Sequence, residues 1–182
     1  MKLIVALTTP QEVMTQCIGL SRQLATQYDT LFVVGEETNH PHIPVCSLEI
    51  ANDRISDVLY LVEWLTTVSS RPQCSARPIE AHEGYVAVPL TCSQELLCFR
   101  DFMVQALKPL RPSMTEEHPE VMEIYAPCLT ITRLRLEKQA EGAVRTVHWK
   151  GDEFTVRSCG VYTAGEHGTC MDRLAEYDFR PY

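Results

Sequence analysis

Two short segments place titratable side chains at alternate positions, the spacing that puts side chains on one face of a β-strand. They are Pro41–His42–Ile43–Pro44–Val45 and Pro127–Cys128–Leu129–Thr130–Ile131. In the second, Cys128, Thr130 and Thr132 would share a face polar enough to line a cleft, and the apolar residues between them would face a core. Imidazole titrates near neutral pH and a thiol somewhat above it, so the chemistry that these side chains could perform is proton transfer.

The elements that must position these side chains follow from apolar periodicity and turn residues, which predict the order β-α-β-α-β-β-α-β-β-β-β. That order is an α+β fold whose helices cover the sheets on one side. A capping-box spacing at Thr9–Glu12 predicts a helix to about Gln27, and the same spacing recurs at Thr91–Gln94. The expected strands are 2–7, 42–50, 74–80, 84–90, 127–136, 144–149, 153–162 and 170–179, with a shorter candidate at 31–34; further helices are expected around 55–65 and 96–110.

Composition bounds the class of protein. The chain has 182 residues, enough for one compact domain over 1–182, and a net charge of −8 with no basic tail. We expect a monomer. We also expect no binding of long nucleic acid, because such binding needs cations distributed over the protein surface. No apolar run is long enough to span a bilayer, so we expect no membrane partner.

The cysteines indicate a reduced chain. All eight are scattered, none forms a C-x-x-C pair, and several lie in apolar stretches where a thiol behaves as a small hydrophobe. We expect a cytoplasmic protein without a structural zinc site. His40 and His42 could share a strand face as metal ligands, but no acidic partner is placed nearby, so we expect no metal and no cofactor.

Over nearly its whole length the chain resembles the 2H phosphoesterase superfamily, which includes 2′,5′ RNA ligase-like proteins and cyclic nucleotide phosphodiesterases. The opening KLIVALTTPQEV is similar to the family's first strand and helix, and the end, FTVRSCGVYTAGEHGTCMDRLAEYDF, is similar to its closing hairpin. HIPVCSLEI and PCLTITRL stand where the family has its two H-x-T/S strands.

The resemblance implies a bilobal fold of two pseudo-symmetric lobes, with antiparallel sheets inside, helices outside and a central cleft. Each lobe would contribute a histidine and a hydroxyl to a metal-independent reaction. One histidine would act as base and the other as acid, and the hydroxyls would hold phosphate oxygens. The implied ligand is a small phosphodiester: a 2′,3′-cyclic phosphate, a 2′,5′-linked or other short oligonucleotide, or a cyclic nucleotide.

The sequence departs from the family pattern in two places. Only His42 and Thr130 match it outright, because Pro44 replaces the first hydroxyl residue and Cys128 the second histidine. The resemblance makes His42, Cys128 and Thr130 the catalytic candidates.

The candidate substrate contacts are Pro44, Thr132, Arg133 and Tyr162. Arg133 stands where the family often has an arginine and could pair with a phosphate, and Tyr162, like Tyr85 and Tyr125, could stack on a base or ribose.

Two alternatives to a hydrolase remain open. The substitutions at Pro44 and Cys128 are compatible with a catalytically silent protein that binds a nucleotide or a protein partner. Cys128 could instead be a nucleophile, which would require a depressed thiol pKa beside His42.

Overall fold

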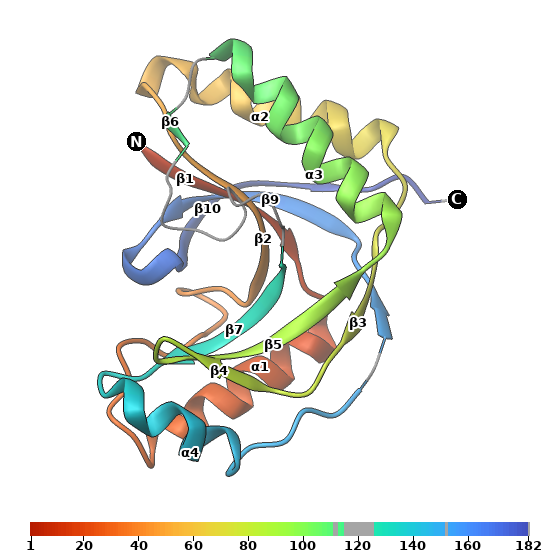
Figure 1. Ribbon diagram of the computed structural model, residues 1–182. Coiled ribbons are helices and arrows are strands. Elements are labelled where there is room, and N and C mark those ends of the chain that lie inside the picture. Colours follow the sequence, from red (N-terminus) through yellow and green to blue (C-terminus); the bar gives the residue numbers. More distant parts are fainter. Residues whose placement is uncertain (111–112, 115–125, 152, 182) are drawn as a thin grey trace.

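The computed structural model describes residues 1–110, 113–114, 126–151 and 153–181, and its strands form two antiparallel sheets between helices (Figure 1). The first sheet has the strand order β10-β9-β1-β2-β6; the second has the order β4-β5-β3-β8, with β7 paired to β5. The strands are β1 Lys2–Thr8, β2 His42–Glu49, β3 Gln73–Ala76, β4 Glu80–His82, β5 Tyr85–Cys92, β6 Ser113–Met114, β7 Cys128–Arg133, β8 Glu153–Thr155, β9 Ser158–Ala164 and β10 Cys170–Asp178. The helices are α1 Gln11–Ala25, α2 Ile55–Val68, α3 Gln94–Leu107 and α4 Ala140–Val144, with 3₁₀ turns η1 Asn52–Arg54, η2 Lys108–Leu110, η4 Glu137–Gln139 and η5 Glu166–Gly168.

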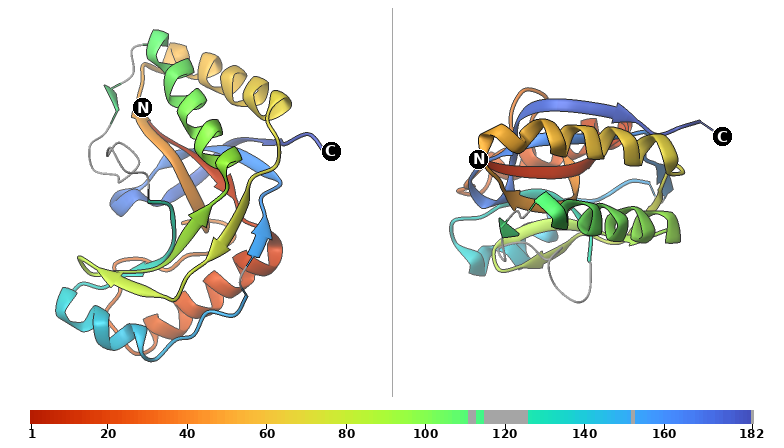
Figure 2. Two further views of the ribbon diagram at one scale, coloured as in Figure 1. Left: turned by 45° about the vertical axis from the view of Figure 1, so that its right-hand side comes forward. Right: turned by 90° about the horizontal axis from the view of Figure 1, so that it is seen from above.

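The helices lie on the outer faces of the two sheets, as the resemblance implies (Figures 1 and 2). Helix α2 packs on β9 and β10 and against α3, whereas α1 packs on β7, and α4 on β4 and β5. Helical spacing of apolar residues explains this packing: α2 buries Val58, Val62 and Leu65 on one face. None of the described helices is long and apolar enough to cross a membrane.

Strand β1 lies in the middle of its sheet, and its two faces are covered by different apolar clusters. Leu3, Val5 and Leu7 join the main core, which also contains residues of the second sheet, whereas Ile4 and Ala6 join a smaller apolar cluster on the opposite face. Its continuous apolar sequence is what a strand covered on both sides requires.

Several predicted elements differ in the structure. Residues 31–34 form no strand, and the predicted strand 144–149 is wrong: the preceding 127–136 strand ends at Arg133, and η4 and α4 follow it. The predicted strand 74–80 is divided into β3 and β4, which pair with different halves of β5. Residues 77–79 separate them: the Arg77 amide still donates to the Pro89 carbonyl of β5 at 2.8 Å, but Pro78 has no amide hydrogen to donate to a strand ladder.

Neither predicted capping box forms. The N-caps are Pro10 in α1 and Ser93 in α3, and neither makes a side-chain capping hydrogen bond. The Thr9 hydroxyl instead donates to the Pro41 carbonyl at 3.4 Å, and the Ser93 hydroxyl accepts from the Gln73 amide at 3.2 Å. These hydroxyls therefore join elements that are distant in sequence.

Candidate active site

A β-bulge at Val45 places His42 and Pro44 outside the main core. The register between β1 and β2 shifts there, so Pro44 and Cys46 lie opposite successive residues of β1. Cys46 and Leu48 are buried in the main core, and strict alternation would put Pro44 and His42 on that same face. The extra residue reverses the alternation, so His42 and Pro44 are only half-buried. Pro44 pairs with Ala6 of β1 beside the bulge, whereas the described strand β6 pairs with β2 only at Leu48 and Glu49.

A second bulge occupies the corresponding position in β7. The register with β5 shifts so that Thr130 and Thr132 lie opposite successive residues of β5, which leaves Ile131 as the extra residue. Thr132 therefore turns to the core side, is fully buried, and donates a hydrogen bond to the Phe32 carbonyl at 2.6 Å. The prediction that Thr132 shares a face with Cys128 and Thr130 is wrong, because the bulge interrupts the alternation on which it rested.

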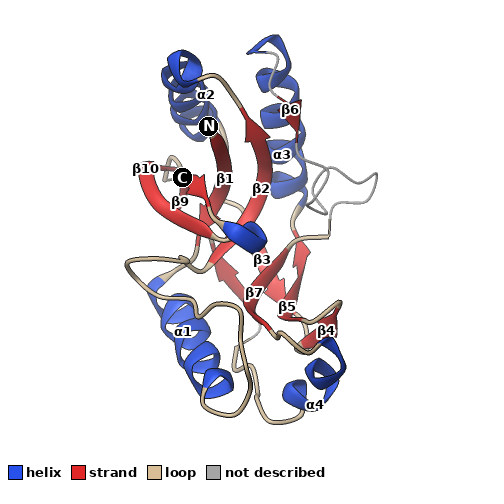
Figure 3. Ribbon diagram, turned by 90° about the vertical axis from the view of Figure 1, so that its left-hand side faces the viewer, coloured by secondary structure: helices blue, strands red, loops and turns tan. Residues whose placement is uncertain are grey.

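The two strands meet near the middle of the molecule, where β2 of one sheet contacts β7 of the other (Figure 3). His42 from β2 and Thr130 from β7 line one small hollow there. Its volume is about 10 Å³, room for no more than a single water molecule. The lining residues are Phe32, Val34, Asn39, His40, His42, Thr130, His167, Gly168 and Thr169.

The backbone fixes the tautomer of His42. Its Nδ1 lies 2.7 Å from the His40 carbonyl oxygen. A carbonyl can only accept, so Nδ1 carries the proton and the neutral ring has its lone pair on Nε2. This is the form of imidazole that acts as a general base. The neighbouring His40 ring has a lowered pKa, mainly because it is buried and also because Arg173 is near.

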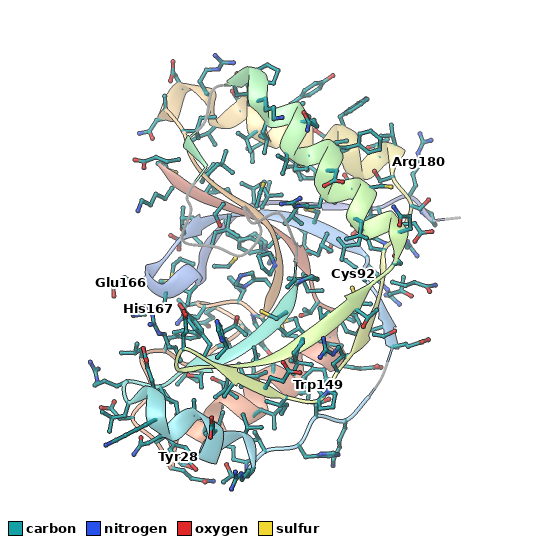
Figure 4. All side chains as sticks on the ribbon, viewed as in Figure 1. Tyr28, Cys92, Trp149, Glu166, His167 and Arg180 are labelled. Atoms are coloured by element: carbon teal, nitrogen blue, oxygen red, sulfur yellow. The ribbon has the colours of Figure 1, made fainter. Side chains whose placement is uncertain are left out.

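His167 joins the site from η5, the turn between β9 and β10 (Figure 4). The Arg133 guanidinium lies 3.3 Å from His167 Nδ1 and donates to the Tyr85 hydroxyl at 3.4 Å. Arginine can only donate, so His167 Nδ1 accepts and its Nε2 carries the proton when the ring is neutral. Arg133 also lies over the Tyr85 ring, with Cζ 4.7 Å from the ring centroid.

Arg133 reaches this position because of the bulge at Ile131. Beyond the bulge Arg133 pairs with Tyr85, and Thr130 pairs with Ala87 two residues along β5. Residues two apart in a strand share a face, so Arg133 and Thr130 lie on the same side of the sheet. The structure thus brings a cation, a hydroxyl and two imidazoles to one region of the molecule.

Three other candidates lie around the hollow without lining it. Cys128 is half-buried, with its Sγ 3.9 Å from the Thr130 hydroxyl. Pro44 lies on β2 opposite Ala6. Tyr162 is 2% exposed, in the smaller cluster with Ile4.

The burial of Tyr162 argues against stacking on a ligand in this conformation. Its hydroxyl is 3.3 Å from that of Thr8, and its ring centroid is 5.5 Å from that of His40. Burial raises the pKa of Tyr162 to about 12, so the hydroxyl stays protonated at neutral pH. A Cβ at Gly160 would lie 2.5 Å from the Tyr162 ring, so only glycine allows the ring its place.

Nothing in the residue pattern indicates that His167 belongs to the site. It lies 34 residues from Arg133 in the sequence, and it comes close through the folding of the β9–β10 hairpin, whose strand β9 pairs with β1. The isolated bridge between His40 and Cys170 holds the loop before β2 against the same turn. Tyr125 lies outside the described residues. Within the described residues, no three His, Cys, Asp or Glu side chains gather as a metal site would require.

Comparisons with known proteins identify the fold. No protein-family model and no curated protein matches the sequence. Solved structures do match: TT0787 of Thermus thermophilus has a TM-score of 0.70 at 15% identity, covering 99% of this chain and 98% of that one. Escherichia coli LigT in complex with 3′-AMP has a TM-score of 0.64 at 12% identity, with coverage of 99% and 98%. The MHV ns2 PDE domain has a TM-score of 0.55 at 11% identity, covering 85% of this chain and 97% of that domain.

The chain therefore has the 2H phosphoesterase fold. Two antiparallel sheets with outer helices match these structures over almost the entire chain, which confirms the α+β architecture expected from the resemblance. At these identities the match establishes the fold, and the chemistry has to be argued from the residues of this chain.

Proposed function

We propose that this chain binds a small phosphodiester between β2 and β7 and hydrolyses it without a metal, with His42 as the general base. The observation that carries the proposal is the His42 imidazole, whose Nδ1 is held by the His40 carbonyl and which shares a hollow with Thr130 from the other sheet. LigT has been crystallised with 3′-AMP, ATP and NADP+, which supports a small nucleotide as the ligand class.

In the proposed reaction His42 Nε2 takes a proton from a water molecule as that water attacks phosphorus. Negative charge then gathers on the phosphoryl oxygens, where hydrogen-bond donors and cations stabilise it. The Thr130 hydroxyl and the Nε2–H of His167 supply donors, and the Arg133 guanidinium, held beside His167 at 3.3 Å, supplies positive charge.

The departing oxygen also needs a proton, and Cys128 is the group that we propose for this role. Its thiol lies next to the Thr130 hydroxyl, at the position where the family has its second histidine. A thiol is a weaker acid at neutral pH than an imidazolium ion, so we expect turnover to be slow. At the end of the cycle the His42 imidazolium gives its proton to solvent and the Cys128 thiolate takes one up.

A second candidate function is ligand binding without catalysis. Pro44 and Cys128 replace a hydroxyl and an imidazole, and the Arg133 guanidinium also lies 3.9 Å from the Glu137 carboxylate. A protein of this kind would hold a nucleotide in the same place and leave it unchanged. Cys128 as a nucleophile would require a depressed thiol pKa, and the 3.9 Å contact with the neutral Thr130 hydroxyl does not by itself supply one.

The test is a hydrolysis assay with 2′,3′-cyclic nucleotides and 2′,5′-linked dinucleotides. It compares the wild type with His42→Ala, Cys128→His and His82→Ala, the last removing an exposed imidazole at the end of β4 as a matched control. We expect slow wild-type turnover that falls by about 10²–10⁴ in His42→Ala, rises in Cys128→His and is unchanged in His82→Ala.

Calorimetric titration with 3′-AMP separates the two functions. Binding without wild-type turnover, together with activity gained by Cys128→His, would establish the silent binder and overturn the hydrolase. Turnover that survives in His42→Ala would contradict the assignment of the base. Absence of both binding and turnover in all variants would refute both functions.

A further inference from the structure

Cys74 and Cys92 face each other directly across the antiparallel pair of β3 and β5. The Ser93 amide donates to the Gln73 carbonyl at 3.1 Å, which marks that neighbouring pair as hydrogen-bonded. Hydrogen-bonded and non-hydrogen-bonded pairs alternate in an antiparallel ladder, so Cys74 and Cys92 form a non-hydrogen-bonded pair. At such pairs the Cα atoms are about 4.5 Å apart, within the range that a disulfide bridges.

The two thiols differ in their surroundings. Cys74 is 2% exposed, whereas Cys92 is partly exposed, and both line an open groove of about 300 Å³. Cys92 is the last residue of β5 and lies immediately before Ser93, the N-cap of α3. The hydrogen bond between the thiols lowers the pKa of Cys92; the same bond, together with burial, raises the pKa of Cys74.

We propose that Cys74 and Cys92 form a thiol–disulfide exchange site for low-molecular-weight disulfides of the glutathione disulfide type. The Cys92 thiolate attacks one sulfur of the small disulfide, forms a mixed disulfide and releases one thiolate. Cys74 then loses its proton and attacks Cys92 Sγ, which forms the Cys74–Cys92 bond and releases the second thiolate. The two protons lost by the cysteines go to the two released thiolates, so one disulfide is reduced as another forms.

The exchange site is separate from the candidate active site. Cys92 ends β5, whereas Tyr85, which contacts Arg133 and the His167 carbonyl, begins it. Seven residues of strand span about 23 Å, and Figure 4 shows Cys92 and His167 on opposite sides of the molecule. The proposal therefore stands or falls independently of the hydrolase.

The test is incubation of the reduced full-length protein with glutathione disulfide, followed by alkylation and digestion with a protease that cleaves after glutamate. Cleavage at Glu63, Glu80, Glu83 and Glu95 leaves Cys74 in peptide 64–80, Cys92 in 84–95, and Cys98 outside both. We expect these two peptides to become cross-linked, with two hydrogen atoms lost and no glutathione retained. Cys98, exposed on α3, serves as the internal control and should carry at most a mixed disulfide.

Two variants test the order of the steps. In Cys74→Ser, Cys92 should stop at the mixed disulfide, because no second thiol faces it. In Cys92→Ser, reaction of Cys74 should slow by about tenfold or more, since the buried thiol loses its exposed partner. A wild type that retains glutathione on Cys92, or that leaves both cysteines reduced while Cys98 reacts, would overturn the proposal. If Cys74 reacts equally fast in the wild type and in Cys92→Ser, Cys92 is not the attacking thiol.

Discussion

His167 combines an unusual backbone conformation with a place at the candidate site. Its φ is 58°, in the left-handed region of backbone conformation that residues other than glycine seldom adopt. Such a conformation costs on the order of 1 kcal/mol and persists where surrounding contacts hold it. Here those contacts include Arg133 at Nδ1 and the Phe32 ring, whose centroid is 6.4 Å from that of His167. Strain of this kind is found preferentially at functional sites.

Replacing His167 by asparagine tests its role as a hydrogen-bond donor to phosphate. Asparagine tolerates the left-handed backbone, so the turn should keep its shape while the imidazole is lost. We expect kcat/KM to fall by about 10²-fold for the hydrolase, with the urea unfolding midpoint nearly unchanged. A fall in the urea unfolding midpoint together with the fall in kcat/KM would instead indicate that His167 has a structural role.

Tyr162 predicts a stability change at alkaline pH. Its pKa is about 12 in the folded chain, compared with 10.0 for an ordinary tyrosine, so between these values the unfolded state releases its proton first. The free energy of unfolding should therefore fall as pH rises from 10 to 12, by roughly 2–3 kcal/mol from this group. Tyr162→Phe removes that contribution and should show a shallower decline in denaturant titrations. Buried Cys17, whose pKa is also raised to about 12, acts in the same direction in both proteins. If the free energy of unfolding declines equally with pH in the wild type and in Tyr162→Phe, the raised pKa of Tyr162 is contradicted.

At the scale of elements, periodicity predicts strands and helices well but does not predict bulges. The segments around His42 and Thr130 form strands as expected, yet single extra residues at Val45 and Ile131 decide which side chains face the hollow. A bulge depends on how two strands pair, and one strand's sequence does not contain that information. For this reason Arg133 could be expected near the site only from the resemblance, and the expected position of Thr132 is wrong.

Gly84 in the β4–β5 hairpin and Gly142 in α4 provide a matched pair of glycine substitutions. Gly84 has a φ of 85°, and a Cβ there would lie 3.2 Å from the Leu134 carbonyl oxygen. Gly142 lies in α4 with nothing within 4 Å of such a Cβ. We expect Gly84→Ala to lower the free energy of unfolding by about 1–2 kcal/mol and Gly142→Ala to raise it by about 0.5–1 kcal/mol. Urea titration measures both free energies of unfolding. If both substitutions change this free energy in the same direction, the argument from the positive φ of Gly84 is contradicted.

At the scale of the whole molecule, the two lobes repeat one local design. Each motif strand carries a polar residue, a second position two residues on, and then a bulge: His42, Pro44 and Val45 in β2, and Cys128, Thr130 and Ile131 in β7. The resemblance predicted two pseudo-symmetric lobes from the order of the segments, but it did not predict the bulges. The resemblance could not predict that His167 lies beside Arg133, because that contact depends on how segments distant in sequence pack.

The net charge of −8 predicts weak electrostatic binding of long RNA. Among the described residues, Arg133 is the cation that we assign to a ligand phosphate; if it neutralises about one phosphate, the affinity for a single-stranded RNA of about 20 nucleotides should change by only about threefold between 50 and 200 mM salt. Fluorescence anisotropy measures this dependence, with a 2′,5′-linked dinucleotide as the short reference ligand. A steep salt dependence, or much tighter binding of the long RNA, would reveal a cationic surface elsewhere.

The small volume of the hollow has a consequence for measured affinities. A space of about 10 Å³ is far smaller than a nucleotide, so a phosphate that enters this hollow between His42, Thr130 and His167 requires β2, β7 and η5 to separate. The apparent dissociation constant is then the intrinsic one divided by the population of the open state. Weak binding by the wild type would consequently measure how rarely the site opens as well as how well its residues fit the ligand. A substitution that loosens η5 would strengthen binding without adding a contact.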